Sequence, residues 1–426
     1  MTFNIITFGC KVNSYESEYI KEQMLNNQYT FSDEPQKSDI VIVNTCSVTN
    51  IADNKCQKMI RSIRRENPSA ILVVCGCSAE NLRDIYNNMD IDILIGNTKK
   101  SEMVSLINNY IKTNEEYHFF SNEEKKSFEN MSVSNYNDLT RAFVKIEDGC
   151  ENFCAFCIIP YVRGNIRSKD MDDIIKEVND LVAHGHKEIV LTGINTGAYG
   201  KDKGYDLTDL IKELSKINNL ERIRISSIEM TEINDKFISE YKNNHKICPH
   251  LHVSLQSGSA KILKLMNRKY TKESYLDNIR KIIASRPDTN LTTDVIVGFP
   301  GETEDDFQEC INFCKEVGFS KIHVFPYSKR EGTVASTMNN QIPNEIKKER
   351  ARRLINIDQE LELSFNKKYL NQEINVLIEE TKNGKSYGHT NNFIKVEIAE
   401  KLEKNQNYKI KVIEAYPLYV IGKIVK

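Results

Sequence analysis

Three closely spaced cysteines constrain this chain more than any other feature of its sequence. Cys150, Cys154 and Cys157 stand in the run GCENFCAFC at residues 149–157. Thiolates at such spacings bind zinc or iron–sulfur clusters. A structural zinc ion normally takes four protein ligands, and neither a histidine nor a fourth cysteine lies close enough in the sequence to complete the set. The spacing therefore favours a four-iron cluster with one open iron over a structural zinc site or unliganded core cysteines.

The cysteine total and the overall composition narrow the class of protein further. An odd total of 11 cysteines in 426 residues argues against a disulfide framework. No stretch approaches the roughly 18 apolar residues of a membrane span, and the N-terminus has no basic flank before a long apolar core, so we expect a cytoplasmic protein that does not enter a membrane. Because the formal net charge is −2, any nucleic acid must be bound through local basic patches.

Residues 1–113 are predicted to form an open parallel α/β domain, in which short apolar runs alternate with stretches of helical length. The runs lie at residues 4–8, 39–43, 70–74 and 91–95. Three of them lead directly into Cys10, Cys46 and Cys77, which should meet because loops after parallel strands share one edge of the sheet. Cys75 is an alternative third ligand. We favour Cys77 because it follows Gly76 into the loop, whereas Cys75 should still lie in the strand.

The rest of the chain is predicted to form a linker, a larger α/β domain and a small barrel. Residues 114–139 are rich in Asn, Ser and Glu without a period, which is typical of a linker. Residues 140–369 alternate six apolar runs with helical stretches, which predicts a partial (β/α) barrel that ends in a long helix over residues 343–369. Short runs within residues 370–426 predict a small antiparallel β-barrel.

The CxxxCxxC loop, with Phe156 before its last cysteine, resembles the signature of the radical S-adenosylmethionine superfamily. The resemblance implies a [4Fe-4S] cluster on Cys150, Cys154 and Cys157, whose open iron chelates S-adenosylmethionine and whose electron cleaves it to a 5'-deoxyadenosyl radical. It also implies cofactor contacts in the loops that follow the predicted strands. The positions expected to make these contacts are Phe156, Gly193, Asn195, Glu229, Gln256, Ser257 and Gly298.

Nearly the whole chain is similar to the methylthiotransferases within that superfamily. The matching stretches are residues 8–13 (FGCKVN), 44–49 (NTCSVT), 76–80 (GCSAE) and 157–168, which begins CIIPYVRG. The resemblance implies a second [4Fe-4S] cluster on Cys10, Cys46 and Cys77, a radical S-adenosylmethionine barrel and a C-terminal TRAM domain that binds RNA. It further implies that S-adenosylmethionine serves both as methyl donor and as radical source, with a low-potential electron donor and a sulfur donor that the sequence does not identify.

The loop at residues 9–17 (GCKVNSYES) is similar to the branch of the family that acts on threonylcarbamoyladenosine of tRNA, the MtaB type, as are residues 388–393 (GHTNNF). That branch converts the nucleoside beside the anticodon to 2-methylthio-threonylcarbamoyladenosine. The branch acting on isopentenyladenosine usually has Gln-Met-Asn after the cysteine. Methylthiolation of isopentenyladenosine or of a ribosomal-protein aspartate remains an alternative, and a zinc-stabilised RNA-binding protein is the alternative from another class.

Two basic runs and a few aromatic residues are the candidates for tRNA contact. Lys58, Arg61 and Arg65 recur at helical spacing after the second cysteine loop and would form one basic face, although a solvated helix face is equally consistent. A second run over residues 347–353 has the same two interpretations. Phe393 is expected to stack on exposed anticodon-loop bases.

Overall fold

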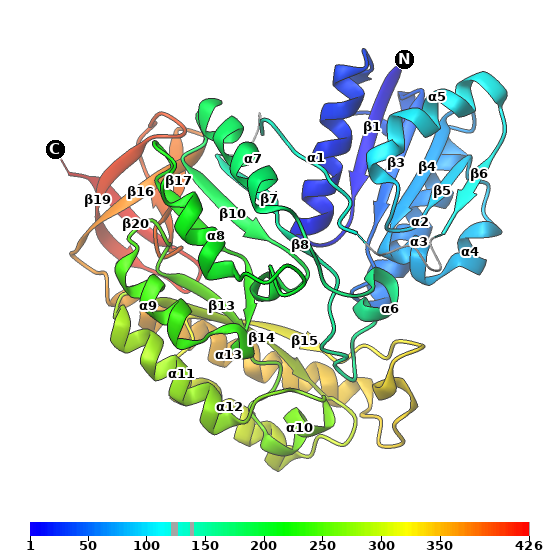
Figure 1. Cartoon of the computed structure of the whole chain (residues 1–426). Helices are drawn as coiled ribbons and strands as arrows, with labels where there is room; N and C mark the ends of the chain where they lie inside the picture. Colours follow the sequence, from blue (N-terminus) through cyan, green and yellow to red (C-terminus); the bar gives the residue numbers. More distant parts are fainter. Residues whose placement is uncertain (121–126, 137–139, 426) are drawn as a thin grey trace.

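The computed structural model describes residues 1–120, 127–136 and 140–425, and its N-terminal part is a six-stranded parallel sheet in the order β2-β1-β3-β4-β5-β6 (Figure 1). The strands are β1 (Thr2–Thr7), β2 (Thr30–Phe31), β3 (Ile40–Thr45), β4 (Ile71–Gly76), β5 (Ile93–Ile95) and β6 (Tyr117–Phe119). The helices are α1 (Lys11–Asn26), α2 (Asn50–Glu66), α3 (Cys77–Asn81), α4 (Arg83–Asn87) and α5 (Met103–Thr113). Helices α1 and α5 pack on one face and α2, α3 and α4 on the other, so β3 is buried throughout, as in a doubly covered parallel sheet.

The linker predicted over residues 114–139 is wrong in two places. Strand β6 lies inside it and pairs with β5, so the N-terminal sheet continues beyond residue 113. Met131 and Val133 are fully buried in the core of the next part. A three-residue strand between polar neighbours has no detectable period, which is why the sequence does not reveal it. Residues 121–126 and 137–139 of the predicted linker lie outside the described residues.

The central part confirms the predicted partial barrel of parallel strands. Its strands are β7 (Arg141–Lys145), β10 (Glu188–Thr192), β11 (Arg222–Ile225), β12 (Ser227–Glu229), β13 (His250–Ser254), β14 (Asn290–Val297) and β15 (Lys321–Pro326). They form one sheet ordered β11-β10-β7 and a second ordered β12-β13-β14-β15. The third predicted run, residues 222–225, forms β11 of the first sheet, and β12 follows it after Ser226 in the second sheet, so the wall of the barrel is divided between two sheets.

Most helices of this central part cover its outside, whereas the first of them packs on α3 of the N-terminal part (Figure 1). The helices are α6 (Ile159–Arg163), α7 (Met171–Ala183), α8 (Leu207–Leu214), α9 (Asp235–Asn243), α10 (Ala260–Leu265), α11 (Lys272–Ser285) and α12 (Glu304–Val317). The pair β8 (Glu147–Asp148) and β9 (Arg167–Ser168) brackets the loop that holds Cys150, Cys154 and Cys157. The antiparallel pairing of β8 with β9 therefore closes the base of the three-cysteine loop.

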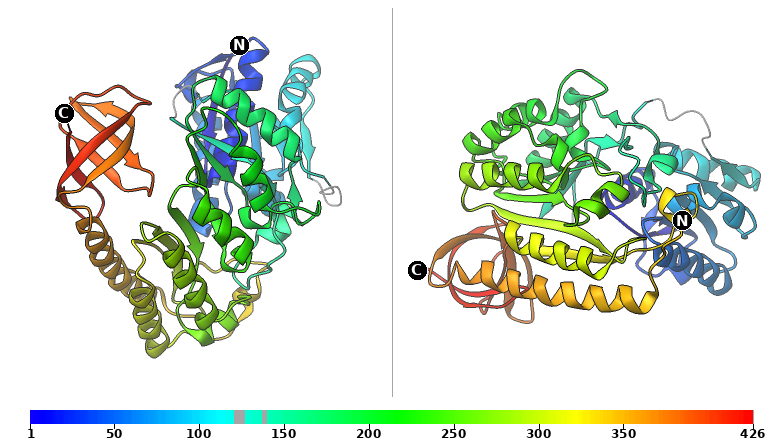
Figure 2. Two further views of the ribbon diagram at one scale, coloured as in Figure 1. Left: turned by 60° about the vertical axis from the view of Figure 1, so that its left-hand side comes forward. Right: turned by 90° about the horizontal axis from the view of Figure 1, so that it is seen from below.

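The long helix α13 (Asn344–Lys367) leads to a closed five-stranded barrel in the order β16-β17-β18-β20-β19, which Figure 2 shows at the far end of that helix. Its strands are β16 (Glu373–Lys382), β17 (Lys385–Thr390), β18 (Lys395–Ile398), β19 (Asn407–Ala415) and β20 (Val420–Ile424). The small barrel is confirmed, but β18 and β20 pair in parallel, so it is not wholly antiparallel. The apolar pattern of the sequence does not reveal β17, because its inward positions are Ser386, Gly388 and Thr390 instead of large apolar residues. Within the described ranges, no helix combines the length and the apolar character needed to cross a membrane.

Candidate functional site

The structure brings the first three cysteines to one edge of the N-terminal sheet. Cys10 precedes α1, Cys46 follows β3, and Cys77 begins α3 directly after β4. Gly9 has φ +109°, and a Cβ atom there would lie 2.6 Å from Cys46 Sγ. Only glycine permits this approach of the two loops, since other residues rarely adopt that φ and any Cβ would collide with the thiol. The edge is therefore built so that the Cys10 and Cys46 loops lie against each other.

The environments of Cys75 and Cys77 differ. Cys75 is fully buried within β4, in the hydrophobic cluster that also contains Phe3 and Ile20. The thiol of Cys77 instead accepts a hydrogen bond from Arg163 Nε at 3.2 Å. The geometry favours Cys77 as the third ligand beside Cys10 and Cys46.

Arg163 belongs to a buried charge network between the N-terminal and central parts, which sequence reasoning missed. Its Nη1 donates to Glu16 at 3.1 Å and to both carboxylate oxygens of Asp148 at 3.0 Å, and its Nη2 donates to Asn13 at 3.0 Å. Lys145 bridges the two carboxylates at 2.7 Å each. Burial alone would raise the pKa of Asp148, but the neighbouring Arg163 and Lys145 hold it well below its usual range. The network ties Cys77 to the loop that carries the second cysteine trio.

Cys150, Cys154 and Cys157 lie in a tight loop between β8 and α6. The Cys157 amide donates to the carbonyl of Cys154 at 2.9 Å, and the Cys154 thiol accepts a hydrogen bond from Arg268 Nη1 at 3.0 Å. Arg268 also pairs with Glu229, one of the predicted cofactor contacts. Burial raises the pKa of Cys150 and of Cys157 to about 12, so these thiols ionise at neutral pH only when a metal stabilises the thiolates.

The sulfur spacing at both sites fits a cluster better than a single ion. One zinc ion holds its thiolates about 2.3 Å away, so three thiolates on it lie only about 4 Å from one another. In the part of the chain that the structure describes, no three cysteine sulfurs lie within 4.8 Å of each other. A four-iron cluster spreads its ligands over separate irons and therefore accepts the wider spacing. A single zinc ion at either trio would need the three sulfurs to lie closer together than the structure holds them.

Glu147, Gly193 and Asn195 lie together where β8 begins and β10 ends. The Asn195 amide donates to Glu147 Oε2 at 2.7 Å, and a Cβ on Gly193 would lie 2.7 Å from the same oxygen. Glu147 Oε1 and Asn195 Oδ1 are buried and have no hydrogen-bond partner among the described residues. Two such acceptors suit the ammonium group of an amino acid, because an unmatched buried oxygen costs free energy.

The other predicted cofactor contacts divide into two groups. Phe156 and Gln256 line a cavity of about 200 Å³ beside Cys157. Ser257 is buried and accepts from the Ser259 amide at 3.2 Å, and the Gly298 amide donates to Glu302 at 2.8 Å. These hydrogen bonds stabilise turns. Neither Ser257 nor Gly298 lines this cavity or the cavity of about 750 Å³ near Cys10.

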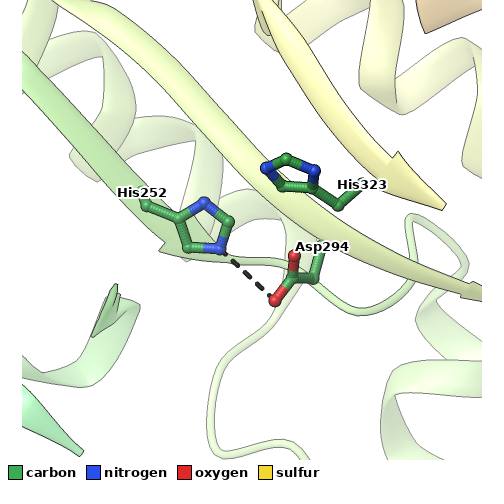
Figure 3. A group of neighbouring side chains, drawn as sticks. All are labelled: His252, Asp294 and His323. Atoms are coloured by element: carbon green, nitrogen blue, oxygen red, sulfur yellow. Dashed lines mark ion pairs between the residues drawn. The ribbon is translucent and has the colours of Figure 1, made fainter. Parts of the chain in front are cut away.

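A cavity of about 750 Å³ lies where the three parts of the protein meet. Cys10 and Lys11 line it from the N-terminal part, Gly193 from the central part, and His389 and Phe393 from the barrel. Figure 3 shows three further polar side chains of its wall, carried by the adjacent strands β13, β14 and β15. These are His252, Asp294 and His323. Since Asp294 also lines the smaller cavity, the two cavities adjoin, one beside Cys10 and the other beside Cys157.

Phe393 does not have the free ring faces that the predicted base stacking requires. Its ring stacks on His389 with centroids 4.6 Å apart, lies 4.9 Å from the ring of His250, and has the guanidinium of Arg224 at 4.6 Å. The residue thus fastens the barrel to β11 and β13 and contributes to the cavity wall. The sequence could not indicate this, because the contacts join segments more than 140 residues apart.

The two basic runs differ in whether their side chains are exposed or paired with carboxylates. Lys58, Arg61 and Arg65 project from α2 into solvent, as one face of an exposed helix. In the second run, Arg350 is buried against Glu302, and Arg353 pairs with Glu304. The first run is available to phosphates, whereas these arginines of the second run attach α13 to the central part.

The comparisons with known proteins agree with this architecture. The model of the radical SAM superfamily matches residues 144–314, and that of the uncharacterized protein family UPF0004 matches residues 2–96. The chain is 40% identical over 430 residues to the threonylcarbamoyladenosine tRNA methylthiotransferase MtaB of Bacillus subtilis, covering 99% of this chain and 95% of that one. It is 35% identical over 438 residues to the tRNA-2-methylthio-N(6)-dimethylallyladenosine synthase of Clostridium perfringens, covering 100% and 98%. Among solved structures, the radical S-adenosylmethionine methyltransferase TsrM of Kitasatospora setae has a similar fold, with a TM-score of 0.56, 13% identity and coverage of 79% and 75%.

Proposed function

Because this chain belongs to the radical S-adenosylmethionine tRNA methylthiotransferases, we propose that it converts N6-threonylcarbamoyladenosine beside the anticodon of tRNA to its 2-methylthio derivative. Enzymes of this family use S-adenosylmethionine and two [4Fe-4S] clusters. We assign one cluster to Cys150, Cys154 and Cys157, and the auxiliary cluster to the trio at the N-terminal sheet edge. With tRNA as substrate, the cytoplasm is the proposed site of action.

The residues around the cavities suit the reaction. Carbon 2 of adenine carries an aromatic C–H bond that is neither acidic nor a leaving group, so the bound cofactors must supply radical chemistry. Glu147 and Asn195 offer buried acceptors to the amino group of S-adenosylmethionine. Cys10 lines the 750 Å³ cavity, so the auxiliary site opens toward the substrate.

The polar wall of this cavity is the main support for threonylcarbamoyladenosine as the substrate. His252, Asp294 and His323 line the same space as the auxiliary cysteine Cys10. An apolar dimethylallyl group would cover the Asp294 carboxylate and the His323 ring without offering either a hydrogen bond, at about 1–3 kcal/mol for each unmatched group, whereas His252 keeps its contact with Thr292. A threonylcarbamoyl group carries a urea, a hydroxyl and a carboxylate, which can pair with them. The cavity therefore favours threonylcarbamoyladenosine over isopentenyladenosine.

Mass spectrometry of digested tRNA tests this assignment. We expect cells that lack the protein to accumulate threonylcarbamoyladenosine and to lose its methylthio derivative, and the full chain to restore the derivative. The Cys157→Ala variant should fail to restore it. Loss of methylthiolated isopentenyladenosine or of the ribosomal-protein modification, with threonylcarbamoyladenosine unaffected, would refute the proposed substrate.

The basic face of α2 should contribute to tRNA affinity. Replacing Lys58, Arg61 and Arg65 together with glutamine removes three exposed cations. If each contacts a phosphate, affinity should fall at least about tenfold at low salt, and the slope of log K against log salt should flatten by about 2. Filter binding at several salt concentrations measures both quantities. The control is Lys112→Gln with Lys315→Gln, two exposed lysines on α5 and α12, and equal effects of the two variants would exclude the α2 face.

A further inference from the structure

We propose that Lys11 binds the carboxylate of the substrate's threonylcarbamoyl group, and that His252, Asp294 and His323 bind its urea and hydroxyl. This inference rests on the proposed function and assigns the recognition of the substituent to four side chains of one cavity. The chemical class of ligand is an anionic, hydrogen-bonding substituent on N6 of an adenine.

Lys11 is an uncommitted cation inside this cavity. It is the first residue of α1, directly after Cys10, and its side chain has no hydrogen-bond or ion-pair partner among the residues that the structure describes. The cavity's Lys321 is different, because Asp358 at 2.7 Å and Glu362 at 3.0 Å neutralise it. Lys395 also lines the cavity without an ion pair among the described residues, but it lies on β18 of the barrel, so Lys11 is the unpaired lysine next to the auxiliary site.

The group on the wall presents both donors and acceptors (Figure 3). His252 Nδ1 lies 3.0 Å from Thr292 Oγ1, which orients the ring, and its Nε2 lies 3.3 Å from Asp294 Oδ2. The carboxylate of Asp294 can accept from urea N–H groups and from a hydroxyl, while the imidazoles can donate or accept. A dimethylallyl group offers none of these partners.

The surrounding charge favours an anion over a metal ion at this place. The ligand atoms of the three wall residues lie within 4.8 Å of one another, as they would around a divalent cation. However, Lys11 interacts electrostatically with both Arg141 and Arg224, whereas Asp294 is the carboxylate that acts on it. Both arginines are paired with glutamates, Arg141 with Glu379 and Arg224 with Glu188, so the unpaired positive charge at this place is that of Lys11, which disfavours a second cation and attracts a carboxylate.

The test compares matched ligands with matched variants. The dissociation constants of anticodon stem-loops carrying threonylcarbamoyladenosine or its methyl ester are measured for the cluster-loaded full chain and for Lys11→Gln. We expect the variant to bind the acid about ten- to hundredfold more weakly, as for the loss of a charged hydrogen bond, and the ester within about twofold of the unmodified protein. Lys112→Gln is the control, and unchanged iron content shows that the neighbouring Cys10 site is intact.

The possible failures are distinguishable. If the unmodified protein binds the threonylcarbamoyl stem-loop no better than a dimethylallyl one, the proposed function and this inference both fail. If it prefers the threonylcarbamoyl stem-loop but Lys11→Gln weakens acid and ester equally, only the role of Lys11 is overturned. His323→Ala should weaken both ligands, since both keep the urea. Binding of one Co²⁺ per chain that disappears in His323→Ala would make the wall group a metal site and overturn its assigned role.

Discussion

Replacing Cys77 with serine should remove the auxiliary cluster, whereas replacing Cys75 with serine should leave it in place. Cys77 begins α3 at the sheet edge near Cys10 and Cys46, while the Cys75 side chain is enclosed in the hydrophobic core behind β4. A serine hydroxyl is a far weaker iron ligand than a thiolate. We expect the methylthiolation activity of the Cys77 variant to fall by more than about 100-fold, because an entire cofactor is missing.

Iron analysis and spectroscopy of anaerobically reconstituted protein measure this effect. The iron content should fall from about eight to about four atoms per chain in Cys77→Ser and stay near eight in Cys75→Ser. Reductive cleavage of S-adenosylmethionine should persist in both variants, because Cys150, Cys154 and Cys157 are untouched. Cys75→Ser should cost about 1–3 kcal/mol of stability through its buried hydroxyl. If Cys75→Ser lost the iron of one cluster and Cys77→Ser kept it, Cys75 would be the third ligand.

Replacing Arg163 with methionine should have the largest effect on stability. Arg163 is fully buried, and its removal leaves Glu16 and Asp148 with one cation fewer and Cys77 without its hydrogen bond. Breaking a buried ion pair from one side typically costs about 3–5 kcal/mol, because the remaining charge has no water to solvate it. The auxiliary cluster should also become easier to lose, since a positive charge beside one of its ligands is gone.

Denaturant unfolding of the loaded protein and iron retention during dialysis are the measurements. Arg353→Met is a matched control, since Arg353 pairs with Glu304 at the surface, where ion pairs contribute about 0–1 kcal/mol. The stability of Arg163→Lys should lie between those of Arg163→Met and Arg353→Met, because lysine keeps the charge but cannot contact Glu16, Asp148 and Cys77 together. If Arg163→Met were as stable as Arg353→Met, the buried charge network would not contribute to holding the N-terminal and central parts together.

Most strands of the fold could be predicted from local sequence patterns. Strands β3 and β4 appear in the sequence as apolar runs bounded by turns, because parallel strands covered on both faces need apolar side chains nearly throughout. Strand β6, with three residues, and β17, with small inward residues, lack that pattern and were missed. Their strand conformation depends on neighbours far along the chain, which no local period reports.

The sequence by itself determined which residues can hold clusters, because thiol chemistry and short ligand spacing are properties of the chain. It also indicated that Cys10, Cys46 and Cys77 follow strands, and hence which edge they share. Only the tertiary structure decided that Phe393 fastens the barrel to the central part, that Arg163 reaches Cys77, and that Lys11 shares a cavity with Asp294. The physical reason is distance along the chain: burial, charge pairing and cavity shape arise between segments that meet only after folding, whereas a ligand's chemistry is local.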